Sequence, residues 1–285
     1  MNVLVATDGS KYGTWALEWM ARFPLVQAPK VKVLHVVDIG ALRAPFMVQP
    51  VIAGTERYLK EEIARIEAHA KKTKQDATKM IKDLHLDGRA LTERGAVAAT
   101  IVKQAKRGVQ FMAIGSRGLD ALDRFMLGSV STYAIHHVSC PVLVVKEEPR
   151  PIARVILAVD GSAPSKKALQ FMVRSMRPWE NVPDQDPITV TVVHSMPFLK
   201  YPELREAGKA MVEDCSSKLA RAGYLVEPAP KLGNPAEEIL NVAHQHKADL
   251  IITGAKGLGA IGRFLLGSVS TRVVQHATCS VLVVR

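Results

Sequence analysis

The sequence predicts an α/β protein made of two tandem copies of one unit. Each copy is expected to be an open, mostly parallel five-stranded sheet with helices on both faces, a Rossmann-like three-layer α/β/α arrangement. The chain has 285 residues, which exceeds the usual size of one domain. The stretch GSRGLDALDRFMLGSVST at 115–132 returns as GAKGLGAIGRFLLGSVST at 254–271, with 12 of 18 positions identical. Apolar runs alternate with helical patterns, as they do when a parallel sheet is covered on both faces.

The first copy is predicted to begin with a strand at 3–6, because this run is apolar and rich in β-branched residues. A glycine turn follows, and the apolar side chains of KYGTWALEWMARF give 11–23 the pattern of an amphipathic helix. By the same criteria we expect further strands at 31–37, 89–93, 109–115 and 141–145, and helices at 57–84, 96–107 and 129–138.

The second copy repeats this order. VLVATDGS from Val3 is echoed by VILAVDGS from Val155, and CPVLVVK from Cys140 returns as CSVLVVR from Cys279. The predicted division is a first domain at 1–146, a linker at 147–152 and a second domain at 153–285.

The copies differ in length in the middle. In the first copy 60 positions lead from His35 to Gly95, whereas in the second 39 lead from His194 to Gly233. The extra segment lies at about 40–58, and we interpret it as either a lid or interface loop, or a packed surface loop.

Composition argues against several classes of protein. The net charge of +11 favours anionic ligands or partners. The densest basic run, at 70–82, contains Asp76 and no aromatic residue for base stacking, so it is interpreted as a solvated helix face rather than a specific nucleic-acid site. No apolar run approaches the roughly 20 residues of a membrane span, and the first residues do not resemble a leader. We therefore expect no membrane partner and a cytoplasmic location.

The cysteines are predicted to be buried or inert thiols. Cys140, Cys215 and Cys279 are odd in number and have no C-x-x-C spacing. This argues against a disulfide framework or a zinc site.

The repeated glycines indicate a ligand site. Ligands of an open parallel sheet bind beyond the carboxyl ends of its strands. Gly115 and Gly254 each end a predicted strand, where glycine lets backbone N–H groups approach an anion. Gly128 precedes Ser129, which is predicted to cap a helix whose free N–H groups and dipole favour a phosphate. Turns and a cap without a ligand would give the same local pattern, but its retention in both copies favours a site.

Charged residues accompany these glycines. Asp8 and Asp160 close the first strand of each copy. Such a carboxylate either accepts hydrogen bonds from a ribose or holds Mg²⁺, or else forms an Asx turn or a helix cap, which the sequence DGS also fits. Arg117 and Lys256 occupy the same place inside G-x-x-G and are candidates for neutralising a phosphate, although cations on a surface loop need no function.

Several catalytic and cofactor motifs are absent from the sequence. There is no G-x-x-x-x-G-K-[ST], no G-x-G-x-x-G after the first strand and no G-x-S-x-G. The sequence therefore supports the binding of a nucleotide better than a reaction on it, and no catalytic residue is predicted.

The spacing G-x2-G-x9-G-[ST], followed by a helix that leads to CPVLVVK, resembles the ATP-binding signature of the universal stress proteins. The resemblance extends to VLVATDGS and HVVD, and it covers nearly the whole chain apart from 40–88. It implies the adenine nucleotide alpha hydrolase-like fold of the tandem-domain members. The signature occurs as Gly115, Gly118, Gly128 and Ser129, and again as Gly254, Gly257, Gly267 and Ser268.

The resemblance also implies the contacts of the ligand. Adenosine would face the end of the first strand, adenine would contact the backbone of Val36, and the residues at 128–131 would take the β- and γ-phosphates. In the second copy Ser195 replaces Val36, and the shorter middle is expected to leave that cleft more open, so the first site is the better candidate. The implied binding residues are Ala6, Thr7, Asp8, Val36, Gly115, Arg117, Gly118, Gly128, Ser129, Val130 and Ser131 in the first copy, and Ala158, Val159, Asp160, Ser195, Gly254, Lys256, Gly257, Gly267, Ser268, Val269 and Ser270 in the second.

The predicted function is ATP binding in stress response or signalling, in one or both domains, with Mg²⁺ near Asp8 or Asp160 where the phosphates carry it. The alternatives are a slow Mg-dependent ATPase and an interaction scaffold that needs no nucleotide. The last strands, PVLVV and SVLVV, either pair within the chain as an internal pseudo-dimer or remain edges, and a homodimer of two chains is a further expectation.

Overall fold

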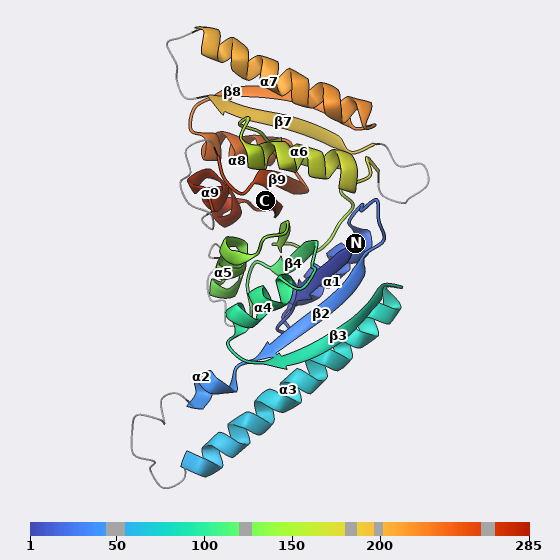
Figure 1. The fold of residues 1–285 in the computed structure, drawn as a ribbon, viewed down its shortest axis with the longest axis vertical. Helices are drawn as coiled ribbons and strands as arrows, with labels where there is room; N and C mark the ends of the chain where they lie inside the picture. Colours follow the sequence, from blue (N-terminus) through green and yellow to red (C-terminus); the bar gives the residue numbers. More distant parts are fainter. Residues whose placement is uncertain (44–54, 120–126, 180–186, 197–201, 258–265) are drawn as a thin grey trace.

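A single ten-stranded sheet runs through the chain. The structure is a computed structural model and describes residues 1–43, 55–119, 127–179, 187–196, 202–257 and 266–285. The strand order is β3-β2-β1-β4-β5-β10-β9-β6-β7-β8 (Figure 1). The strands are β1 (Asn2–Ala6), β2 (Lys30–Val37), β3 (Asp87–Arg94), β4 (Phe111–Gly115) and β5 (Val142–Val145) in the first copy, and β6 (Arg154–Ala158), β7 (Thr189–Met196), β8 (Leu225–Leu232), β9 (Leu250–Gly254) and β10 (Ser280–Val284) in the second.

The last strand of each copy joins the two halves of this sheet. Strands within a copy pair in parallel, whereas β5 and β10 pair antiparallel, with Leu143 opposite Leu282. Two separate sheets were the wrong expectation, because each final strand finds its hydrogen-bonding partner in the other copy. The internal pseudo-dimer is the alternative that the structure shows.

Helices cover both faces of the sheet. On one face α1, α3, α6 and α7 pack on a core that includes Val3 and Val5, and on the other α4, α5, α8 and α9 pack on a core that includes Leu4 and Ala6. Alternate side chains of one strand thus enter different cores, as the continuous apolar runs predict. The helices are α1 (Lys11–Arg22), α2 (Ile39–Arg43), α3 (Thr55–Asp83), α4 (Val97–Ala105), α5 (Ser129–His137), α6 (Ala163–Ser175), α7 (Pro202–Arg221), α8 (Pro235–Gln245) and α9 (Ser268–His276).

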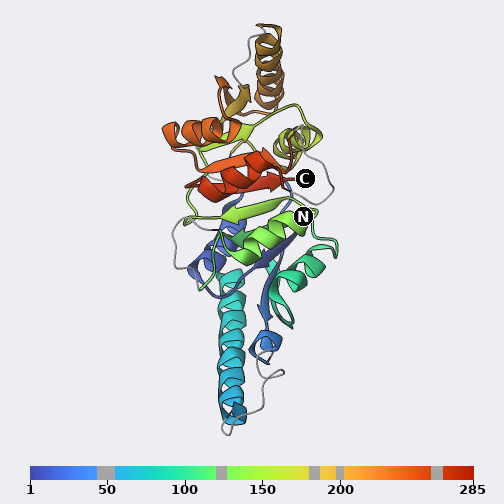
Figure 2. The ribbon, with the colours of Figure 1, turned by 90° about the vertical axis from the view of Figure 1, so that its left-hand side faces the viewer.

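The long helices α3 and α7 lie at opposite ends of the molecule, along the outer strands of each copy (Figures 1 and 2). On α3, Ala70, Thr73, Ala77 and Ile81 are buried at helical spacing, while the lysines of the basic run at 70–82 are exposed. The interpretation of this run as a solvated helix face is confirmed. None of the helices in the described ranges combines the length and the apolarity needed to cross a membrane.

Two basic side chains form hydrogen bonds between the copies across the β5–β10 junction. Lys146 Nζ donates hydrogen bonds to the carbonyl oxygens of Ala277 at 2.5 Å and Gln275 at 3.2 Å, at the end of α9. Arg285 reciprocates by donating to the Ile135 carbonyl in the last turn of α5. The last carbonyls of a helix lack intrahelical donors and carry partial negative charge, so a cation stabilises each of these helix ends.

The three cysteines are free and buried, as predicted. Burial raises the pKa of Cys140 to about 11 and that of Cys279 to about 12. Both thiols therefore stay protonated and unreactive at neutral pH. Of the segment predicted as a lid or a packed loop, at 40–58, residues 44–54 lie outside the described part of the chain.

Candidate functional site

A cavity of about 440 Å³ opens at the carboxyl ends of β1, β2 and β4. After β1 the chain crosses to one face of the sheet and after β4 to the other, because α1 and α5 belong to different helix layers. The cavity lies at this point of divergence. Its volume is typical of small-ligand pockets, which span about 300–1,000 Å³. All the residues predicted for the first copy line it. Among the residues that the structure describes, the lining is Ala6, Thr7, Asp8, Gly13, Leu34, Val36, Val97, Ile101, Ile114, Gly115, Arg117, Gly118, Leu119, Gly128, Ser129, Val130 and Ser131.

One wall of this cavity is apolar. It is formed by side chains of β2, β4 and α4 that also belong to, or pack against, the core beneath α4 and α5. A planar, mostly apolar group fits such a wall, and a polar group fits beside the backbone N–H groups that also line the cavity. The apolar residues are Leu34, Val36, Val97, Ile101 and Ile114.

The first glycine of each signature allows a helix to approach a strand. A β-carbon on Gly115 would lie 2.6 Å from Cβ of Tyr12 in α1, and one on Gly254 would lie 2.7 Å from the backbone nitrogen of Ser165 in α6. Neither contact has room for a side chain. This glycine is therefore needed for the close packing of the helix on the strand. The same packing leaves the backbone at this position open to a ligand.

The second glycine meets the aspartate that closes the first strand. Asp8 accepts hydrogen bonds at Oδ1 from the N–H of Ser10, at 3.0 Å, and at Oδ2 from the N–H of Leu119, at 2.9 Å. The first bond is the Asx turn that the sequence DGS allows. The second ties the loop after Gly118 to the end of β1. In the second copy, Asp160 makes the same turn with Ser162 at 3.0 Å.

The third glycine, rather than the serine after it, caps the helix of each signature. Gly128 is the N-cap of α5 and Gly267 that of α9, and neither helix has a side-chain cap. Our expectation that Ser129 caps the helix was wrong, because the helix begins at that residue. Within the described part of the chain, the N–H groups of Ser129, Val130 and Ser131 have no protein acceptor, as is usual in a first helical turn. Such an end attracts anions.

Two hydrogen bonds fix this helix end against the sheet. The N–H of Gly128 donates to the Ser116 carbonyl at 2.8 Å, and the buried hydroxyl of Ser131 donates to the Gly115 carbonyl at 2.6 Å. The second copy repeats both, with Ser270 bonded to the Gly254 carbonyl at 2.7 Å. Because its proton is engaged in this way, the Ser131 hydroxyl mainly positions the helix, and its N–H is the group available to a ligand.

Arg117 is held at the rim of the cavity by an aromatic residue of α1. Its Nη1 atom donates to the Tyr12 hydroxyl at 2.6 Å, and its guanidinium lies 5.0 Å from the centre of the Tyr12 ring. A guanidinium held by an aromatic ring in this way keeps its charge while losing part of its freedom of movement. The first cavity thus has a positioned cation beside its polar side.

Two histidines near the first site were not predicted as site residues. His35 donates through Nδ1 to the Thr7 carbonyl at 3.0 Å, and burial lowers the pKa of its imidazole. His69, from α3, donates through Nε2 to the Asp8 carbonyl at 2.9 Å. These bonds fix the end of β1. The signal for His35 was present in the sequence, since His194 occupies the same place and donates to the Val159 carbonyl at 2.8 Å. Nothing in the sequence places α3 beside Asp8.

The equivalent cavity of the second copy is smaller, about 100 Å³. We expected a more open cleft because this copy has a shorter middle, and that expectation was wrong. Ser165 adds a side chain where the first cavity has Gly13, and its Oγ atom accepts the Asp160 N–H at 3.1 Å. Of the residues predicted for this copy, all line the cavity except Gly267 and Ser268. The volume lies below the usual range for ligand pockets.

The chain itself offers no ready-made metal site in the described ranges. There, no group of three or more His, Cys, Asp or Glu side chains is placed to hold a metal ion. Asp8, the predicted magnesium candidate, has both oxygens engaged with backbone N–H groups. A divalent cation in this cavity would therefore need the ligand to supply most of its oxygen atoms.

Comparisons with known proteins agree with this arrangement. A universal stress protein of Mycolicibacterium smegmatis is 29% identical over 100% of this chain and 97% of its own, and one of Mycobacterium tuberculosis is 28% identical over 100% and 95%. The crystal structure of a universal stress protein from Archaeoglobus fulgidus has the same fold, with a TM-score of 0.69 at 20% identity over 100% of this chain and 98% of that one. The profile of the universal stress protein family matches residues 1–146 and again 151–285. The chain therefore belongs to the universal stress protein family, and its membership of this family supports a role in the response to stress.

Proposed function

We propose that the first copy binds ATP and that this binding serves the protein's role in the stress response. The observation that carries the proposal is the N-terminal end of α5, which has no side-chain cap and lines a cavity of small-ligand size at the carboxyl edge of the sheet. A helix end of this kind provides N–H groups and a favourable dipole for phosphate oxygens. The resemblance of the glycine signature to that of ATP-binding family members supports the same ligand.

Each part of ATP has a matching part of the cavity. The apolar wall of β2, β4 and α4 accommodates adenine, beside the backbone of Val36. Gly115 and Gly118 lie where the ribose and α-phosphate pass, with Arg117 close by. The N–H groups of Ser129, Val130 and Ser131 then take the β- and γ-phosphates. Mg²⁺ would reach the chain through these phosphates.

We infer that the first copy holds nucleotide and that the second does so weakly or not at all. The two signatures are equally intact in sequence, but the cavities have volumes of about 440 and 100 Å³. A nucleotide in the second copy would have to displace side chains first, and this costs affinity.

Binding without efficient hydrolysis is the expected chemistry. A general base must lie within reach of the attacking water, and among the described residues that line the cavity Asp8 is the one carboxylate. Because both of its oxygens accept backbone N–H groups, it acts as a positioning residue for the loop at Gly118. A slow ATPase that uses Asp8 as base would instead lose phosphate release in an Asp8→Asn variant that still binds ATP.

The test is mass spectrometry of whatever nucleotide the purified protein retains, followed by calorimetric titration with ATP. We expect an adenine nucleotide and a stoichiometry of one ATP per chain. Absence of both retained nucleotide and heat of binding contradicts the proposal. A partner protein that is captured equally well with and without a working first cavity would favour the scaffold alternative.

A further inference from the structure

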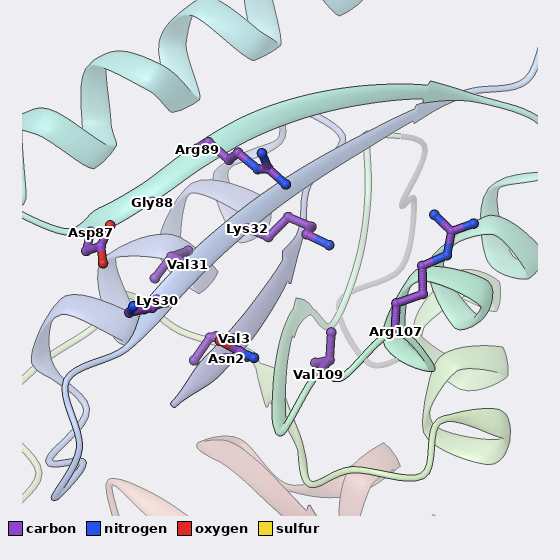
Figure 3. A pocket seen from close by; sticks show the side chains of 10 residues that line it. All are labelled: Asn2, Val3, Lys30, Val31, Lys32, Asp87, Gly88, Arg89, Arg107 and Val109. Carbon is purple, nitrogen blue, oxygen red and sulfur yellow. The ribbon is translucent and has the colours of Figure 1, made fainter.

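A second cavity, of about 340 Å³, lies at the opposite edge of the first copy, at the amino ends of β1, β2 and β3 (Figure 3). We call it the basic cavity. Its lining is Asn2, Val3, Lys30, Val31, Lys32, Asp87, Gly88, Arg89, Arg107 and Val109. None of these residues lines the cavity at the carboxyl edge, so the two sites are separate.

Positive charge dominates this lining. Lys30, Lys32, Arg89 and Arg107 are basic, and Asp87 is the one acidic side chain among the lining residues that the structure describes. In the sheet register Asp87 pairs with Lys30, whereas Lys32 pairs with Arg89. Like charges on directly adjacent positions repel each other. Within the described residues, no ion pair involves any of the four cations.

Three of these cations extend toward the same space. Lys32 and Arg89 project from neighbouring strands on the α4 side of the sheet, and Arg107 projects from the segment between α4 and β4 (Figure 3). A cation is favourable just beyond the end of a helix, and this alone accounts for Arg107. It does not account for the two cations on the strands.

In the second copy, the side chains at the equivalent positions contact one another. The counterparts of Lys32 and Arg89 are Thr191 and Glu227, each the third residue of its strand. The counterpart of Arg107 is His246, four positions before the next strand. The three side chains bind one another: the Thr191 hydroxyl donates to Glu227 Oε2 at 3.3 Å and lies 3.4 Å from His246 Nδ1, which is 3.3 Å from Glu227 Oε2.

At equivalent positions, the second copy thus has three polar side chains that contact one another, and the first copy has three cations that extend toward one space.

We propose that the basic cavity binds a compact anion with several phosphate groups, such as an oligophosphate. Two arginines provide planar forks that match phosphate oxygens, and Lys32 adds a point charge. The cavity has the size of a small-ligand pocket, and the described residues of its lining include none of the aromatic side chains on which nucleic-acid bases stack.

The test is a titration of the full chain with inorganic tripolyphosphate, followed through backbone amide shifts in NMR spectra. The amides of Val31 and Gly88 report on the basic cavity, and that of Gly128 reports on the carboxyl-edge cavity, so binding at the two places is measured separately. We expect saturable shifts at Val31 and Gly88. Absence of saturation there overturns the proposal.

The second copy supplies the substitutions for the variant. Lys32→Thr with Arg89→Glu introduces the residues of Thr191 and Glu227, and should weaken binding at Gly88 by at least about tenfold while leaving the Gly128 shifts unchanged. Lys71→Thr with Lys79→Glu makes the same change in net charge on the exposed face of α3, and should change binding by less than about twofold. Equal losses in both double variants overturn the proposal, because the effect would then be one of overall charge.

Two further measurements keep the result interpretable. The single variant Arg107→His alters a residue outside the strands, so it can be tested even if the double variant fails to fold. It should weaken tripolyphosphate binding as reported by the Gly88 amide. Lys32→Arg retains the charge and should retain binding. A single-stranded oligonucleotide that saturates the Gly88 shift at a lower concentration than tripolyphosphate would overturn the choice of a small anion.

Discussion

A β-carbon added to Gly118 would lie 2.5 Å from the Oδ2 atom of Asp8, the atom that accepts the Leu119 N–H. A side chain at this position would force the Asp8 carboxylate to move. The glycine therefore lets the carboxylate hold the loop through its bond to Leu119.

Gly118→Val should displace this loop and weaken ATP binding by at least about tenfold, the equivalent of one lost charge-assisted hydrogen bond. The matched control is Gly257→Val, where the added carbon would lie 2.7 Å from Asp160 Oδ2. If the first copy holds the nucleotide, this control changes the affinity by less than about twofold. Calorimetry on both variants decides, and equal losses would place ATP in both copies.

Ser131→Ala removes the buried hydroxyl that donates to the Gly115 carbonyl at 2.6 Å. An unsatisfied buried acceptor costs about 1–3 kcal/mol, so the free energy of unfolding should fall by that amount in urea titrations. Ser270→Ala removes the same bond in the second copy and should cost a similar amount. ATP affinity should fall only for Ser131→Ala, and an unchanged affinity in that variant would argue against α5 as the phosphate site.

Lys146→Met removes a charged donor from two carbonyls at the end of α9 and should lower the free energy of unfolding by about 1.5–3 kcal/mol. Burial lowers the pKa of Lys146 to about 8, so the urea titration belongs at pH 6.5, where the ammonium is charged. Lys146→Arg should retain most of the stability, because Arg285 makes the reciprocal contact. A full loss in the arginine variant would mean that packing rather than the charged contact is responsible.

His35 should make stability depend on pH. Burial lowers its pKa in the folded protein, so as the pH falls below about 6.5 the unfolded chain takes up a proton that the folded chain resists. The free energy of unfolding should therefore fall from pH 7 to pH 5. His35→Gln should reduce this slope in denaturation curves, whereas the exposed His276→Gln provides the matched control. An unchanged slope in the His35 variant would assign the dependence to other groups.

The α/β architecture was predictable because local patterns decide it. Strands buried on both faces, such as β4, are continuous apolar runs, and the repeated glycine signature marks the carboxyl edge in each copy. These features depend on neighbours in the chain or on the rules of parallel sheets. The resemblance to the family signature implied eleven of the residues that line the first cavity, whereas it did not imply Gly13, Leu34, Val97, Ile101, Ile114 and Leu119.

The rest depends on which elements cross in space. His69 reaches Asp8 from a helix 61 residues away in the chain, and Arg117 meets Tyr12 across 105 residues. The difference in volume between the two cavities arises from small changes such as Ser165 in place of Gly13. Cap assignment failed for a related reason, because Gly128 and Ser129 differ by one position and only the hydrogen-bond geometry separates them.

The antiparallel junction of β5 and β10 gives the molecule two unlike rims. Since the strands of the two copies run in opposite directions, the carboxyl edge of one copy continues into the amino edge of the other. One rim carries the large cavity of the first copy and the self-paired Thr191, Glu227 and His246. The other carries the small cavity of the second copy and the basic cavity. A partner that approaches from one side would therefore meet the cavity proposed for ATP, and a partner from the other side would meet the cations of the basic cavity, although both copies pair their strands in the same order.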